Sequence, residues 1–230
     1  MGPRRSRSGS YGRKALGFQW RTILVLALCA FLMAPLARAA APLKIVALGD
    51  SLTAGYGLPD DAAFPAQLQK ALKAKGYDVS IVNAGVSGDT TTAGLDRLAW
   101  SVPDGIDGVI LELGANDALR GVEPKVTKAA LEKILDRLAK RNIPVLLAGM
   151  QSPRNMGADY VKAFDAIYPA LAANHQVVFY PFFLAGVAAD PKLNQGDGMH
   201  PNPQGVDVIV ERMLPSVEEL IARAKKARAS

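Results

Sequence analysis

The chain has 230 residues, of which 27 are basic and 21 are acidic, so its formal net charge is +6. Seven of the basic residues and none of the acidic ones lie in the first 39 positions, so the rest of the chain carries 20 basic and 21 acidic residues. This near-neutral balance excludes a protein that binds nucleic acid through an excess of positive charge. Cys29 is the only cysteine, so positions 40–230 hold no disulfide framework, thiol nucleophile or zinc–thiolate site.

The N-terminal segment has the order of a secretory signal peptide. Residues 1–21 are basic, residues 22–36 form an uncharged and mostly apolar run, and Ala37-Arg38-Ala39 is a small-residue cleavage site. The apolar run is shorter than the roughly 20 residues of a membrane-spanning helix. We therefore expect a signal peptide over 1–39, a single domain over 40–230, and a periplasmic or secreted protein with no membrane span after processing. An uncleaved N-terminal anchor is the alternative.

From residue 43 onward, short apolar runs alternate with amphipathic stretches. Runs rich in Val, Ile or Leu predict five buried strands, at 43–48, 79–82, 108–113, 144–148 and 176–180. Helical periodicity predicts four long helices, at 62–75, 126–141, 159–173 and 203–227. The alternation predicts a three-layer α/β/α sandwich with a mostly parallel, five-stranded, flavodoxin-like sheet. Sites in such sheets lie beyond the carboxyl ends of the strands.

Polar residues and glycines follow the first three predicted strands. Ser51 either caps the next helix or is a nucleophile exposed at the strand-to-helix turn. Gly85 and Gly88 either form a turn or allow a ligand to approach the backbone closely, and Asp89 would cap the following helix. Asn116 either caps a turn or donates hydrogen bonds from its amide.

A carboxylate and an imidazole lie three residues apart near the end of the chain. Asp197 can reach and orient His200 within one tight segment. The alternative is that Asp197 is only a turn residue and His200 only a helix-start or core residue. The other histidine, His175, lies at a predicted helix end, where a cation suits the helix dipole. His200 is therefore the candidate general base.

Four segments resemble, in order, the four sequence blocks of the SGNH (GDSL) hydrolases. They are Gly49–Tyr56, Gly88, Gly114–Asp117 and Asp197–Asn202. From about residue 43 to residue 219 the chain is most similar to the bacterial thioesterase I / lysophospholipase L1 / arylesterase group. The resemblance implies a serine hydrolase that cleaves acyl esters or thioesters. A sugar O-acetylesterase of the same superfamily, a non-catalytic binding module and a metallohydrolase are the alternatives.

The resemblance also implies a role for each candidate residue. Ser51 would be the nucleophile, His200 its general base and Asp197 the residue that orients the imidazole. The Ser51 amide, the Gly88 amide and the Asn116 side chain would form the oxyanion hole. The resemblance implies no cofactor and no metal. It implies a small-molecule acyl ester or thioester as substrate, with no nucleic acid and no obligate protein partner.

The segment after the fourth predicted strand differs from the sequence that is common in this group. Residues 150–156 read MQSPRNM, which leaves the acyl preference open. Met150, Met156, Phe182 and Phe183 are candidates for an apolar acyl groove, or else belong to the core. Residues 118–122 are a candidate flap.

Overall fold

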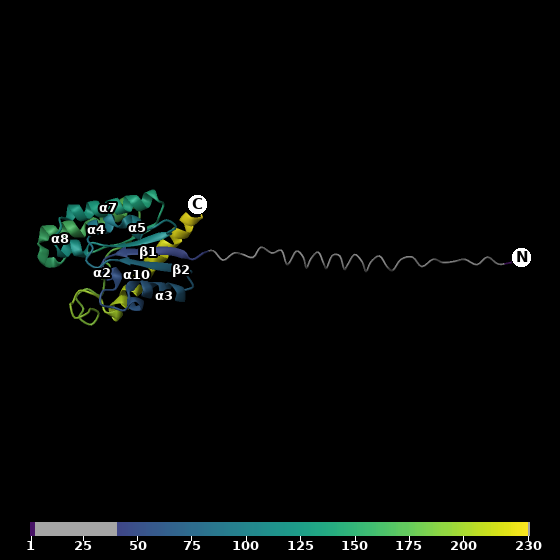
Figure 1. Cartoon of the computed structure of the whole chain (residues 1–230), viewed down its shortest axis with the longest axis horizontal. Helices are drawn as coiled ribbons and strands as arrows, with labels where there is room; N and C mark the ends of the chain where they lie inside the picture. Colours follow the sequence, from purple (N-terminus) through teal and green to yellow (C-terminus); the bar gives the residue numbers. More distant parts are fainter. Residues whose placement is uncertain (3–40, 230) are drawn as a thin grey trace. The chain divides into compact units, whose positions relative to one another are not determined.

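Five apolar segments pair into one parallel sheet in the computed structural model, which describes residues 1–2 and 41–229 (Figure 1). The strands are β1 (Leu43–Gly49), β2 (Val79–Gly85), β3 (Gly108–Glu112), β4 (Val145–Ala148) and β5 (Val178–Tyr180). Their order is β2-β1-β3-β4-β5, with every neighbouring pair parallel. This is the flavodoxin-like order, in which the direction of strand succession reverses between β1 and β3. The predicted fold class is confirmed.

Helices cover both faces of the sheet (Figure 1). On one side lie α4 (Thr91–Asp96), α5 (Leu98–Ser101) and α7 (Pro124–Lys140), and on the other α2 (Ser51–Ala54), α3 (Phe64–Ala74) and α10 (Pro203–Arg228). The remaining helices are α6 (Ala115–Leu119), α8 (Ala158–Asp165), α9 (Ile167–His175), and the 3-10 turns η1 (Asp60–Ala62) and η2 (Arg154–Met156). The predicted helical periodicity is confirmed in α7, which buries Leu131, Ile134, Leu135 and Leu138 against the core.

The prediction that all five strands are buried is wrong for β2. This strand pairs with β1 alone and forms an edge of the sheet. Val82, near its middle, is 45% exposed. An apolar run does not distinguish a central strand from an edge strand, because both carry apolar side chains that pack against helices.

The single helix predicted over 159–173 is divided into α8 and α9 at Ala166. Pro169 has no backbone N–H and cannot donate to the carbonyl of Asp165, so the regular hydrogen-bond pattern is interrupted there. Both helices still face the core, and they bury Phe164, Ile167, Tyr168 and Leu171.

The expected signal peptide lies outside the described residues, apart from Met1 and Gly2, so its processing stays a prediction. Within the part of the chain that is described, no helix combines the length and the apolar character needed to cross a membrane.

Candidate active site

Ser51 lies where β1 ends and α2 begins, at the carboxyl end of the sheet. Asp50 is the N-cap of α2, because its carboxylate accepts the backbone N–H of Leu52 at 3.0 Å. The capping role that the sequence left open for Ser51 thus belongs to its neighbour. The Ser51 amide is at the first position of the helix, where backbone N–H groups have no acceptor within the helix.

His200 connects Ser51 to Asp197. Its Nε2 lies 2.9 Å from the Ser51 Oγ, and its Nδ1 lies 2.6 Å from Asp197 Oδ2. The other carboxylate oxygen accepts the backbone N–H groups of His200 at 3.0 Å and Met199 at 2.9 Å. These two backbone hydrogen bonds, together with the imidazole, lower the pKa of Asp197 to about 2. Asp197 is therefore an ionised acceptor at neutral pH, so Nδ1 carries the ring proton and Nε2 is free to accept one.

The segment that carries His200 is held by its own backbone and by the loop after α2. Gln195 donates its backbone N–H to the His200 carbonyl at 2.7 Å and its side-chain amide to the Tyr56 carbonyl at 2.7 Å. The Tyr56 ring lies 4.6 Å from the His200 ring, centroid to centroid. These contacts help to bring together Ser51 and His200, which are 149 positions apart in sequence.

Asn116 is the second residue of α6, directly after β3, and it is not the cap of that helix, because Gly114 occupies the N-cap position. Its Nδ2 donates to the Asp89 carbonyl at 3.0 Å and to Asp50 Oδ2 at 3.2 Å. Since the Asp89 carbonyl can only accept a hydrogen bond, the amide nitrogen must be the atom on this side. Asn116 thus connects the turn before Ser51 to the loop after β2.

Gly85, the last residue of β2, and Gly88, in the loop after it, differ in their surroundings. The Gly85 amide donates to Asn83 Oδ1 at 3.0 Å, and a Cβ at Gly85 would lie 2.2 Å from the Ala54 nitrogen, so this glycine allows α2 to pack on β2. Gly88 has a φ of +87°, which favours glycine, and its amide has no hydrogen bond within the described part of the chain. Gly88 is not among the residues that line the cavity described below, but it precedes Asp89, whose carbonyl Asn116 contacts.

The expected cap role of Asp89 is wrong. Thr90 is the N-cap of α4, with its hydroxyl accepting the Ala93 N–H, while the Asp89 carboxylate pairs with Arg97 at 2.5 Å. Thr90 takes the cap because it is the residue that directly precedes the helix. Arg97 is a residue of this region that the sequence analysis did not single out.

Two buried carboxyl groups lie behind the Ser51 turn. Burial raises the pKa of Asp50 to about 6. Burial and the nearby Asp50 raise the pKa of Glu112 well above its usual value. Glu112 Oε2 accepts the Thr53 hydroxyl at 2.7 Å. Glu112, at the end of β3, thus holds α2 through the Thr53 hydroxyl, and the sequence signal that it offered was a carboxylate inside an apolar strand.

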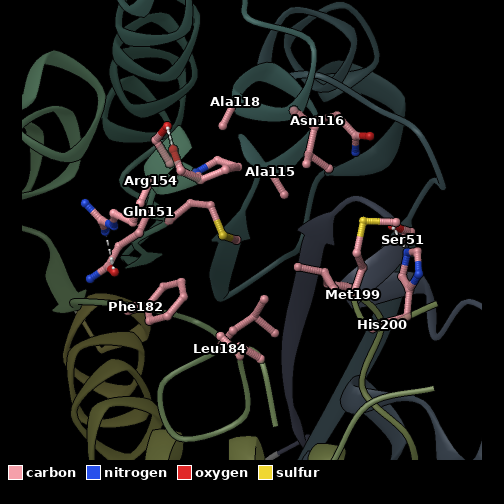
Figure 2. A pocket seen from close by; sticks show the side chains of 18 residues that line it. Ser51, Ala115, Asn116, Ala118, Gln151, Arg154, Phe182, Leu184, Met199 and His200 are labelled. Atoms are coloured by element: carbon pink, nitrogen blue, oxygen red, sulfur yellow. Dashed lines mark hydrogen bonds between the residues drawn. The ribbon is translucent and has the colours of Figure 1, made fainter. Parts of the chain in front are cut away.

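A cavity of about 470 Å³ extends from Ser51 across the carboxyl edge of the sheet. Figure 2 shows Ser51 and His200 at one end and Gln151 and Arg154 at the other. Apolar side chains line the space between, among them Leu119, Met150, Phe182, Leu184 and Met199.

The candidates for the acyl groove therefore divide. Met150 and Phe182 line the cavity, whereas Met156 is not among its lining residues. Phe183 belongs to the core, where it packs edge-on against Phe64 at 5.1 Å between ring centroids. The candidate flap over 118–122 borders the cavity at its first two residues, and its motion stays a prediction.

A serine, a histidine and an aspartate in a hydrogen-bonded chain recur in hydrolases with a serine nucleophile, on several unrelated folds. Comparison with known proteins agrees with that class. The model of the GDSL-like lipase/acylhydrolase family matches residues 47–208. An arylesterase from Vibrio mimicus is 41% identical over 169 residues, which cover 73% of this chain and 84% of the relative.

Two further relatives match over more of their length. The thioesterase 1/protease 1/lysophospholipase L1 of Escherichia coli (strain K12) is 39% identical over 206 residues, covering 89% of this chain and 95% of the relative. The crystal structure of TesA is similar with a TM-score of 0.73 at 37% identity, covering 77% of this chain and 99% of that one. The chain belongs to the GDSL-like lipase/acylhydrolase family and is an ester or thioester hydrolase. The resemblance to SGNH hydrolases is confirmed.

Proposed function

We propose that this enzyme hydrolyses acyl esters and thioesters through a covalent acyl-enzyme formed on Ser51. The observation that carries the proposal is the hydrogen-bonded chain from Ser51 through His200 to Asp197 at one end of an apolar cavity. A serine hydroxyl is a poor nucleophile until a base removes its proton, and His200 Nε2 lies at the distance such a base requires.

The reaction follows from these positions. The Ser51 Oγ attacks the substrate carbonyl carbon while its proton passes to His200 Nε2. The tetrahedral intermediate expels the alcohol or thiol, which takes that proton, and Ser51 keeps the acyl group. A water molecule then loses a proton to His200 and attacks the acyl carbon, and the carboxylic acid leaves as the proton returns to Ser51. Asp197 stabilises the imidazolium in both halves.

Three donors would stabilise the oxyanion. The Ser51 amide at the start of α2 and the Gly88 amide have free N–H groups within the described residues. Asn116 Nδ2 contacts Asp50, which precedes Ser51, and Asp89, which follows Gly88. Asn116 would exchange its longer contact, 3.2 Å to Asp50, for the oxyanion while it keeps the Asp89 carbonyl. Such preorganised donors act where charge develops, not in the ground state.

The apolar lining of the cavity supports a substrate whose acyl group is aliphatic or aromatic. We expect turnover of p-nitrophenyl esters and acyl-CoA thioesters to change gradually with chain length, by about 1 kcal/mol or about fivefold per methylene until the cavity is filled. The measurement is kcat/KM over a series from acetyl to long-chain esters, with acetylated sugars alongside. A strong preference for the acetylated sugars over every aliphatic ester would support the sugar O-acetylesterase alternative instead.

The order of basic, apolar and small residues before position 40 supports export with removal of residues 1–39. We expect N-terminal sequencing of the exported protein to begin at Ala40 or within two residues of it. Full-length protein beginning at Met1 in the periplasm would contradict cleavage and favour the anchor.

A further inference from the structure

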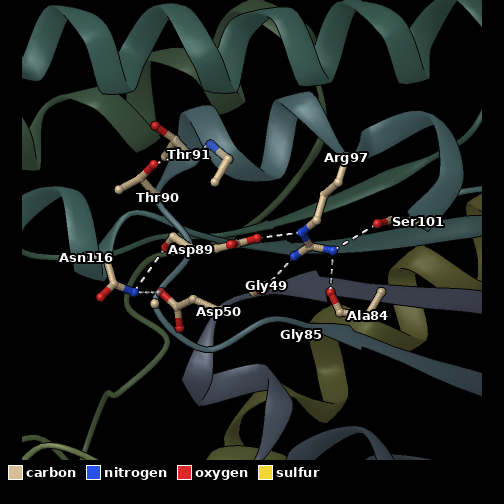
Figure 3. A network of polar contacts seen from close by, with 12 residues as sticks. Gly49, Asp50, Ala84, Gly85, Asp89, Thr90, Thr91, Arg97, Ser101 and Asn116 are labelled. Atoms are coloured by element: carbon tan, nitrogen blue, oxygen red, sulfur yellow. Dashed lines mark hydrogen bonds and ion pairs between the residues drawn. The ribbon is translucent and has the colours of Figure 1, made fainter.

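Arg97 joins α4 to α5, and it is buried, with only 7% of the residue exposed. Figure 3 shows the guanidinium group in the middle of a network of acceptors. Nε donates to Asp89 Oδ2 at 2.5 Å, and Nη2 donates to the Gly49 carbonyl at 2.8 Å. Nη1 donates to the Ala84 carbonyl and to the Ser101 hydroxyl, both at 2.9 Å.

Two of these acceptors belong to the segments that the proposed reaction uses. Gly49 directly precedes Asp50 and Ser51, at the end of β1, and its carbonyl also accepts the Val86 N–H at 3.0 Å. Asp89 directly follows Gly88 in the loop after β2. One planar group therefore spans the turn that carries the nucleophile and the loop that carries the Gly88 amide.

Asp89 is held from two sides. Its carboxylate accepts from Arg97, and its carbonyl accepts from Asn116 Nδ2 at 3.0 Å. The Gly88 carbonyl in turn accepts from Arg120 Nη2 at 2.9 Å. The left-handed backbone at Gly88 permits a sharp turn but does not fix its direction. These contacts hold the two peptide groups that follow the Gly88 amide and so restrain the direction of the turn.

We propose that Arg97 is a positioning residue of the oxyanion hole, which fixes the Gly88 and Ser51 amides relative to each other through Asp89 and Gly49. This inference rests on the proposed function. A lysine has three donors on a single nitrogen and cannot reach separate acceptors on two strands and a loop, as the guanidinium fork does. Displacement of reacting groups by about 1 Å is enough to cost about 10²-fold in rate.

The test compares Arg97→Lys and Asp89→Asn with the wild type in kcat, KM and the inhibition constant of an aliphatic trifluoromethyl ketone. The Ser51 Oγ adds to the carbonyl carbon of that ketone, and the serine proton passes to His200. The resulting oxyanion then lies in the oxyanion hole. We expect each variant to lose about tenfold to 10²-fold in kcat and to bind the ketone more weakly by a similar factor, with KM changed less than about threefold.

Arg141→Lys is the matched control. Arg141 also holds backbone carbonyls, those of Val102 at 2.7 Å and Pro103 at 2.8 Å, but in the loop that precedes β3, at the opposite end of the sheet. We expect its kcat and its affinity for the ketone to stay within about twofold of the wild type. Each variant is assayed well below its own melting temperature, and Asp89→Asn, which is nearly isosteric, decides the matter should Arg97→Lys fail to fold.

Two results would overturn the inference. One is a folded Arg97→Lys or Asp89→Asn protein with kcat and ketone affinity within about twofold of the wild type. The other is a loss of kcat with unchanged affinity for the ketone, which would place the impaired step outside the oxyanion hole. Failure of the proposed function looks different, because the wild type would then not bind the ketone and Ser51→Ala would still turn over esters.

Discussion

Ser51→Ala is expected to lower ester turnover by about 10⁴-fold or more, because no other hydroxyl lies at hydrogen-bond distance from His200 among the described residues. The Ser51 side chain is only half-buried, and its hydroxyl has His200 as its hydrogen-bond partner in the described structure. Its removal should therefore leave the melting temperature within a few degrees of the wild type. The measurement is kcat for a p-nitrophenyl ester, with substrate binding followed separately.

His200→Ala and the double variant are the controls for that prediction. If the two residues act as one unit, each single variant and the double variant should retain similar, very low turnover, since the second loss removes nothing further. Multiplicative losses in the double variant would show that Ser51 and His200 act independently. Substantial turnover by a folded Ser51→Ala protein would contradict the covalent mechanism.

Asn116→Ala is expected to lower kcat by about 10² to 10³-fold, the effect of removing one oxyanion donor. KM should change only a few-fold, because the oxyanion forms in the transition state and not in the bound substrate. The side chain also joins Asp50 to the Asp89 carbonyl, so some loss of melting temperature is expected as well. The measurement is kcat and KM beside the melting temperature of the variant.

Alanine is the informative replacement at this position. Aspartate is nearly isosteric, but it would place a carboxylate against Asp50 and the Asp89 carbonyl, so it would harm a purely structural contact too. A folded Asn116→Ala protein with kcat within a few-fold of the wild type would assign Asn116 a structural role only.

The sequence located the fold and most of the candidate site because both depend on local patterns. Apolar runs of strand length, separated by helical periodicity, define a parallel sheet, and the position after each strand directed attention to Ser51 and Asn116. The spacing of three between Asp197 and His200 allowed contact within one segment, and the structure has that contact at 2.6 Å.

What the sequence did not reveal depends on contacts between distant segments. The acceptors of Arg97 include backbone carbonyls 13 and 48 positions away, and no side-chain pattern identifies such partners. The assignment of Asp89 as a cap failed because α4 begins one residue later than expected, so that Thr90 directly precedes the helix, and the Asp89 carboxylate pairs with Arg97 instead. The sequence also does not indicate which strand lies at the edge of the sheet, so the apolar run in β2 predicts a buried strand.

The central claim is that Ser51 forms the covalent intermediate, and labelling with a p-nitrophenyl alkylphosphonate tests it most directly. The Ser51 Oγ would bond to phosphorus, nitrophenolate would leave, and the serine proton would pass to His200. Intact-mass and peptide mass spectrometry should show one adduct per molecule on the peptide that contains Ser51, formed as activity is lost and absent from Ser51→Ala. Loss of activity without an adduct, or an adduct on another residue, would contradict the account.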